Sequence, residues 1–162
     1  MNKISPCLWF DNNAEEAMNF YVSVFKNAKI VSIDRYPEGY TEGPLAGMSG
    51  KVINGVFEIE GQRFICLDGG PLFKFNESIS FEVDVDTQEE LDHYWNHLSA
   101  VPESEQCGWL KDKFGVSWQI VPKRLGELLN DPDKEKSRRV MDTMMQQHKI
   151  IIAELEAAYN GV

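Results

Sequence analysis

Residues 108–122 read GWLKDKFGVSWQIVP. This pattern predicts one strand, a tight turn at residues 112–115, and a second strand that ends at Pro122. Alternation along the second strand places Trp118 on the helix side of a sheet and Ser117 and Gln119 on the other side. A half-buried glutamine needs hydrogen-bond partners. Gln119 is therefore expected either to tie the structure together or to face a ligand.

The rest of the chain also shows patterns typical of strands and helices. Residues 79–85 alternate between apolar and polar side chains, and a helix with its cap at Asp86 or Thr87 follows them. The first half shows a similar order, so β-α-β-β-β is expected twice, at about residues 4–68 and 78–121. The other predicted elements are strands at residues 4–10, 30–36, 51–59 and 64–67, a helix at residues 14–25, and a loop or weak strand at residues 102–106.

The C-terminal extension is expected to be helical. Asp131, Pro132 and Asp133 place a proline at the first position of a helix behind a capping aspartate. Apolar side chains then recur every three or four residues as far as Leu155, which predicts a helix of about 25 residues. An apolar stripe of this length must be buried, either against its own domain or against a second subunit. A homodimer is therefore expected, in which exchange of this helix is an open alternative.

Composition narrows the classes of function. The formal net charge is −10 over 162 residues, which argues against nucleic acid and anionic membrane surfaces as partners. The three cysteines, Cys7, Cys66 and Cys107, contain no CxxC pair and do not suggest a disulfide framework. The sequence contains neither a signal-peptide pattern nor a run of about 20 apolar residues. These features predict a cytoplasmic protein.

A resemblance to a known family rests on the following motifs: ISPCLWF at 4–10, AEEA at 14–17, FY at 20–21, ISF at 79–81, YW at 94–95 with Leu98, residues 108–122, DPD at 131–133 and VM at 140–141. On these motifs the chain resembles the PhnB-like group of the vicinal-oxygen-chelate superfamily, often labelled 3-demethylubiquinone-9 3-methyltransferase domain proteins. The superfamily includes glyoxalase I, extradiol dioxygenases, and fosfomycin- and bleomycin-resistance proteins. The resemblance implies a single α+β domain in which two β-α-β-β-β modules form an open cup-shaped sheet. Module one would span about residues 1–70, module two about residues 76–123, and the helical tail about residues 124–162.

The resemblance also implies where metal ligands would lie. Metal-using relatives place His, Glu or Gln at four strand positions. Here those positions correspond to one of Ser5, Pro6 and Cys7, to Cys66 or Asp68, to Ser78, and to Gln119. Serine and glutamine are weak ligands, so we expect neither a tight divalent metal nor another cofactor. His93 and His97 stand four residues apart, but the apolar stripe of their helix points elsewhere, so both are expected in solvent. His148 lies in the apolar stripe of the tail, which predicts a core or interface position.

Polar and aromatic side chains on the strands provide the candidate binding site. Asp68 and Glu82 are the candidate catalytic carboxylates, although Glu82 could instead pair with Lys111 or Lys113. Cys7 and Trp9 share one side of their strand and could face the cup. A packed position in the core is the alternative for Trp9 and the favoured interpretation for Cys7. Trp109, with these residues, would suit a small and partly apolar ligand. The complete candidate set is Cys7, Trp9, Asp68, Ser78, Ser80, Glu82, Trp109 and Gln119.

Three functions remain open at this point. The first is a protein that binds a small organic molecule without a metal. The second is a metal- or base-assisted enzyme that acts on a small oxygenated substrate. The third is a structural or regulatory dimer with a vestigial cup. Methyl transfer is not expected, because Gly69 and Gly70 follow a strand without the glycine-rich opening of a helix that an adenosyl cofactor usually requires.

Overall fold

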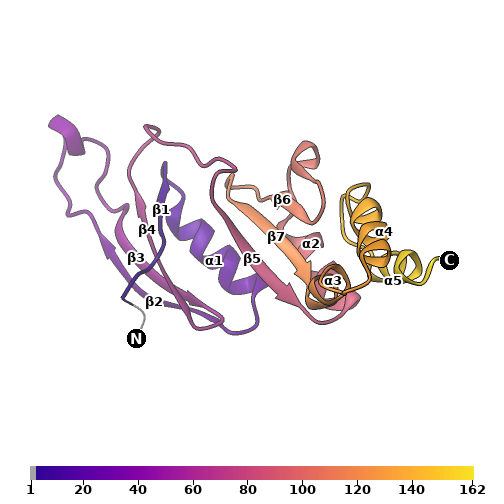
Figure 1. The fold of residues 1–162 in the computed structure, drawn as a ribbon. Helices are drawn as coiled ribbons and strands as arrows, with labels where there is room; N and C mark the ends of the chain where they lie inside the picture. Colours follow the sequence, from indigo (N-terminus) through magenta and orange to yellow (C-terminus); the bar gives the residue numbers. More distant parts are fainter. Residues whose placement is uncertain (1–2) are drawn as a thin grey trace. The chain divides into compact units, whose positions relative to one another are not determined.

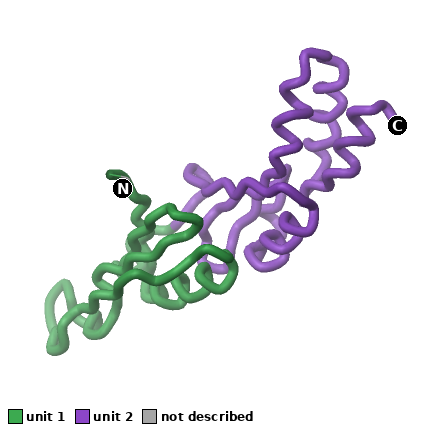
Figure 2. Tube along the Cα trace, turned by 90° about the horizontal axis from the view of Figure 1, so that it is seen from below, with its two compact units in different colours: residues 1–74 green, residues 75–162 purple. Residues whose placement is uncertain are grey.

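The computed structural model describes residues 3–162. The chain divides into two compact units, Met1–Lys74 and Phe75–Val162, which Figure 2 shows in green and purple. Each unit combines a small sheet with helices, which confirms the predicted α+β class. None of the helices in the described part of the chain is both long and apolar enough to span a membrane.

Unit 1 contains a four-stranded sheet in the order β1-β4-β3-β2. Strand β1 runs parallel to β4, and the other neighbouring strands are antiparallel (Figure 1). The expected order of strand, helix and three strands is therefore present. The elements are β1 (Cys7–Phe10), α1 (Ala14–Val24), β2 (Ala28–Arg35), the short 3-10 helix η1 (Gly43–Leu45), β3 (Val52–Ile59) and β4 (Gln62–Asp68).

Helix α1 covers one face of the unit 1 sheet. Its buried side chains recur at three- and four-residue spacing, as an amphipathic helix requires. Tyr21 stacks on Phe57 with 6.0 Å between ring centroids. A Cβ atom at Gly55 would lie 2.6 Å from Cys66 Sγ and 2.8 Å from Met18 Sδ. The close approach of helix and sheet therefore requires glycine at this position.

Unit 2 contains a three-stranded sheet in the order β5-β7-β6. Strand β5 is parallel to β7, and β6 is antiparallel to β7. Thr87 caps α2, as predicted, by accepting a hydrogen bond from the Glu90 N–H. The possible weak strand at residues 102–106 is a 3-10 turn, and Gln106 forms an isolated bridge with Trp109. The elements are β5 (Ser80–Val85), α2 (Gln88–Leu98), η2 (Pro102–Ser104), β6 (Trp109–Lys111) and β7 (Ser117–Pro122).

The C-terminal extension forms three helices, which corrects the expectation of one helix of about 25 residues. These are α3 (Lys123–Leu129), α4 (Lys134–Met144) and α5 (Ile152–Asn160). The helix stops after Met144 because the next segment binds the chain ahead of β6. The carbonyls of Gln147 and His148 accept hydrogen bonds from the N–H groups of Cys107 and Gly108, each at 2.8 Å.

An aspartate caps the tail helix α4, but two residues later than expected: the cap is Asp133 instead of Asp131, and Pro132 lies before the helix instead of at its first position. The side chain of Asp133 accepts hydrogen bonds from the N–H groups of Glu135 and Lys136 at the start of α4. His148, which was expected in a core or interface, is exposed within this chain, and its Nδ1 lies 2.7 Å from the Glu105 carbonyl oxygen. Part of the apolar stripe is buried within unit 2, at Val140 and Leu155, and Ile150, which lies outside the predicted stripe, is buried as well. Met141 and Met145 remain exposed.

Candidate functional site

The sheet of unit 2 has one apolar face and one polar face. Leu110, Trp118 and Ile120 are buried on the apolar face, and α2 packs on this sheet. The opposite face is called here the unit 2 open face. Register places Glu82 and Trp109 on either side of Gln119, and alternation places all three on this face. Its strand residues are Ser80, Glu82, Asp84, Trp109, Lys111, Ser117, Gln119 and Val121.

Gln119 is linked directly to Ser80. The Gln119 amide Nε2 donates a hydrogen bond of 2.9 Å to the Ser80 hydroxyl. This bond joins β7 to β5 through side chains, so Gln119 does tie the structure together. The Ser80 hydroxyl keeps its own proton to donate, because it accepts in this bond. The two neutral groups can therefore orient a polar ligand atom but offer it no charge.

Four residues of this face were absent from the set predicted from the sequence: Asp84, Lys111, Ser117 and Val121. Lys111 lies opposite Ser117, and its Nζ donates to the Glu77 carboxylate. That hydrogen bond lowers the pKa of Glu77 below its ordinary value. Ser117 is only 2% exposed. Alternation alone placed Ser117 on this face, but nothing in the sequence distinguished it from an ordinary strand serine.

Ser78 lies outside the sheet, because β5 begins two residues later. Its backbone N–H and its hydroxyl both donate to the Asn76 side-chain oxygen, which forms a local turn. Ser78 is therefore not brought onto the open face with Ser80 and Gln119, contrary to the expectation that these residues form one site. Alternation holds only within a strand, and β5 does not extend back to Ser78.

Cys7 and Trp9 lie on the face of unit 1 opposite α1. Their neighbours Leu8 and Phe10 are buried beneath the helix, whereas Cys7 is exposed and Trp9 is half-buried. The Trp9 Nε1–H donates to the Gly70 carbonyl at 2.9 Å. A Cβ atom on Gly69 would lie 2.2 Å from the indole ring, so glycine allows the ring to lie flat against the chain. Trp9 is thus fixed in place but keeps accessible surface.

Asp68 has a structural environment, which corrects the expectation that it faces a ligand with Trp9. It lies on the same side of β4 as Cys66, towards α1, and is only 3% exposed. Its Oδ1 accepts from the Ala14 N–H and its Oδ2 accepts from the Val52 N–H, each at 2.9 Å. The carboxylate therefore joins the start of α1 to the start of β3.

Neither Cys7 nor Cys66 is an activated thiol. Cys7 is exposed as a residue, but partial burial of its sulfur raises the pKa of the thiol. Burial, with smaller contributions from Asp68 and Cys7, raises the pKa of the Cys66 thiol to about 12. Nucleophilic chemistry needs the thiolate, which is favoured by a nearby cation or helix N-terminus. Both thiols therefore stay protonated at neutral pH.

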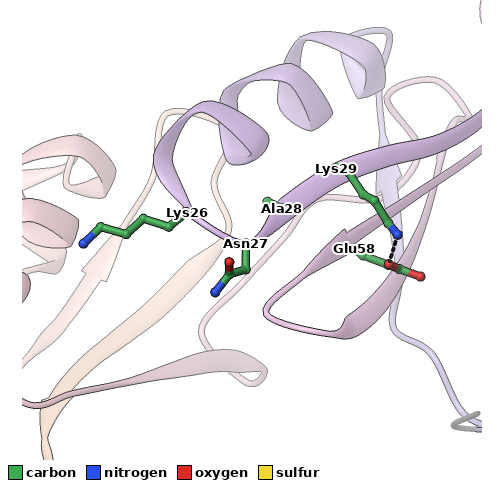
Figure 3. A pocket seen from close by; sticks show the side chains of 5 residues that line it. All are labelled: Lys26, Asn27, Ala28, Lys29 and Glu58. Carbon is green, nitrogen blue, oxygen red and sulfur yellow. Dashed lines mark ion pairs between the residues drawn. The ribbon is translucent and has the colours of Figure 1, made fainter.

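Two shallow pockets occur in unit 1, away from Cys7 and Trp9. One, of about 300 Å³, lies between the end of α1 and strand β2 and is lined by Lys26, Asn27, Ala28, Lys29 and Glu58 (Figure 3). Lys29 and Glu58 form an ion pair of 3.0 Å across it. The other, of about 360 Å³, includes Arg35 and Asp68. Arg35 is paired with Glu15 at 2.8 Å. In both pockets the charged side chains already neutralise one another in part.

The donor set does not fit a tight divalent metal. Gln119 and Ser80 are neutral and bind each other, while both oxygens of Asp68 are engaged by backbone N–H groups. Within residues 3–162, no three His, Cys, Asp or Glu side chains are grouped closely enough to hold an ion. His93 and His97 have ring centroids 4.4 Å apart, and His97 Nδ1 lies 2.7 Å from the His93 carbonyl oxygen.

Comparison with known proteins places the chain in a family. The family model described as 3-demethylubiquinone-9 3-methyltransferase matches residues 2–121. A PhnB protein from Bacillus cereus is 41% identical, with a TM-score of 0.62, over 75% of this chain and 99% of that chain. Protein PA1353 from Pseudomonas aeruginosa is 19% identical, with a TM-score of 0.57, over 75% of this chain and 98% of that chain. Among curated proteins, no match was found.

The family match ends at Val121, which is also near the end of the unit 2 sheet. The matched region therefore contains β1 to β7 but excludes the helices α3 to α5. The proteins compared above likewise cover about three quarters of this chain and nearly all of their own length. The chain belongs to the PhnB-like family, whose family model carries the 3-demethylubiquinone-9 3-methyltransferase description.

Proposed function

We propose that this protein binds a small, partly apolar organic molecule on the unit 2 open face, without a tightly bound metal. The observation that supports this proposal is the gathering of Ser80, Glu82, Trp109 and Gln119 on one face. Aromatic surface beside a few polar groups is the usual composition of a small-molecule site. Cys7 and Trp9 provide a similar surface on the open face of unit 1, but they are not part of the proposed unit 2 face.

A base-assisted reaction is the second candidate function. Glu82 is exposed on the open face and lies next to Gln119 in register, so its carboxylate can accept a proton from a bound molecule. Asp68 is a poorer base because its two oxygens already accept backbone hydrogen bonds. Glu82 is therefore the carboxylate that we propose for such chemistry. Methyl transfer is not part of this proposal, since the family description alone supports it.

We also propose that the protein is a cytoplasmic homodimer. Met141 and Met145 keep exposed apolar surface on and just after α4, and a second copy of the chain is the simplest cover for it. In this arrangement the helices after Val121 would contribute to assembly. The proposed binding face does not depend on the dimer, because all of its residues belong to unit 2 of one chain.

Binding can be tested by two-dimensional NMR of the full chain with a set of small aromatic acids, amides and alcohols at about millimolar concentration. We expect amide shifts to cluster on β5, β6 and β7. Trp109→Leu should weaken binding by about 5- to 10-fold, because an aromatic contact contributes about 1 kcal/mol. Tyr40→Leu removes an exposed ring from unit 1 and should leave affinity unchanged. Shifts that avoid these three strands across the whole set would exclude the proposed face.

A further inference from the structure

A lysine and a serine form a distinct polar pair at one end of the unit 2 open face. Lys111 on β6 is directly opposite Ser117 on β7. Side chains at opposed positions of antiparallel strands have Cβ atoms about 4.5–5.5 Å apart and lie on the same face. The Lys111 ammonium and the Ser117 hydroxyl can therefore reach a common atom between them.

Ser117 has an unusual environment for a serine. The residue is only 2% exposed, and its buried Oγ has no hydrogen-bond partner among the residues that the structure describes. A buried hydroxyl without a partner is costly, and such groups are rare in native proteins. The hydroxyl carries one proton that it can donate. An acceptor atom brought to this position would remove the cost.

Lys111 provides charge at the same position. Its side chain is 20% exposed, and its ammonium donates to Glu77, whose own side chain is 60% exposed. An ammonium has three protons to donate, so the bond to Glu77 does not exhaust it. Among the open-face residues of β5, β6 and β7, Lys111 is the single basic side chain, whereas Glu82 and Asp84 are acidic. These acids lie further along β5, opposite Gln119 and Val121 rather than Ser117.

We propose that Lys111 and Ser117 form a subsite for a carboxylate oxygen of the bound molecule. The inference rests on the proposed binding function and specifies the class and direction of the ligand. The carboxylate accepts from the Lys111 ammonium and the Ser117 hydroxyl, and the apolar part of the molecule extends towards Trp109, about 7 Å away along β6. Repulsion by Glu82 and Asp84 disfavours the reversed orientation.

The test compares phenylacetate with its neutral counterpart phenylacetamide, each titrated into the full chain and followed by NMR. Lys111→Met should weaken phenylacetate binding by about 10-fold or more, because charged hydrogen bonds are the stronger kind, and should change phenylacetamide binding by less than about 3-fold. Lys113→Met removes the same charge two residues away and serves as the matched control. Glu77→Gln should strengthen phenylacetate binding, because it removes the carboxylate that competes for Lys111.

Ser117→Ala gives a second and independent readout. It should lower phenylacetate affinity while leaving the melting temperature equal to or above that of the wild type, because the variant loses an unpartnered buried hydroxyl. A lower melting temperature would show that the hydroxyl has a structural partner and would overturn the subsite. Unchanged phenylacetate affinity in Lys111→Met would also overturn it, although binding to the face would stand. If neither probe shifts the open-face amides, the proposed function fails together with the subsite.

Discussion

Asp112→Ala is expected to lower the free energy of unfolding by about 3–5 kcal/mol, because it leaves three donors without their acceptor. Asp112 is only 1% exposed. Its Oδ1 accepts from the N–H groups of Phe114 and Val116, and its Oδ2 accepts from the Trp118 indole. The carboxylate thus holds the turn between β6 and β7 and fixes the indole in the core. Denaturant unfolding of the full chain, followed by tryptophan fluorescence, measures the loss.

Two further variants serve as controls for the stability loss expected in Asp112→Ala. Asp142→Ala removes an exposed aspartate that pairs with Arg138 at 3.7 Å, and it should cost less than about 1 kcal/mol. Asp112→Asn can keep the bonds to the turn but presents an amide N–H₂ to the indole N–H, so its cost should fall between those of the other two. A loss in Asp112→Ala no larger than that of Asp142→Ala would show that the turn and indole do not depend on this carboxylate.

Asp68→Ala is expected to lower the free energy of unfolding by about 2–4 kcal/mol, because two buried backbone N–H groups lose their acceptor. These belong to Ala14 and Val52, the first residues of α1 and β3. Hydrogen exchange followed by NMR should show faster exchange at both amides than in the wild type. Because the two segments are distant in sequence, loss of protection at both would identify their common acceptor.

Asp11→Ala is the matched control for Asp68. Asp11 is exposed and lies in the turn between β1 and α1, so removing its carboxylate should leave both amides protected. If Asp68→Ala were as stable as Asp11→Ala, the structural role of Asp68 would be wrong. The earlier interpretation of Asp68 as a ligand-facing carboxylate would then become the better one.

Alternation predicted much of the unit 2 site. A strand of six residues, with Trp118 and Ile120 on one side and Ser117 and Gln119 on the other, has a single arrangement that buries the apolar side. The loop that precedes β5 was less predictable. Ser78 has the same parity as Ser80, and only the turn with Asn76 shows that the strand has not yet begun.

The sequence predicted the wrong face of the sheet for Asp68 because β4 is apolar at successive positions. With Ile65, Cys66 and Leu67 in a row, the sequence does not indicate which side is covered by the helix. The structure decides it through Met18, which contacts the face that carries Cys66. Sequence parity correctly put Cys66 and Asp68 on one face, but the face was the buried one.

The end of helix α4 after Met144 could not be predicted from the sequence either. Apolar spacing continues through the segment, and residues 144–151 contain neither proline nor glycine. The helix ends because the carbonyls of Gln147 and His148 accept hydrogen bonds from the N–H groups of Cys107 and Gly108. These two residues lie about 40 residues earlier in the chain. Tertiary hydrogen bonds of this kind leave no periodic signal. The unpartnered Ser117 hydroxyl likewise leaves no periodic signal, because its lack of a partner depends on the folded environment.

Native mass spectrometry of the freshly purified full chain, prepared without chelator and without a metal-binding tag, tests the central claim most directly. The claim is that the unit 2 open face binds an organic molecule without a tight metal. We predict chains whose mass includes no stoichiometric divalent ion, and added phenylacetate should appear as one adduct per chain that Trp109→Leu weakens. About one retained divalent ion per chain, lost in Gln119→Ala, would contradict the account and favour metal-assisted chemistry.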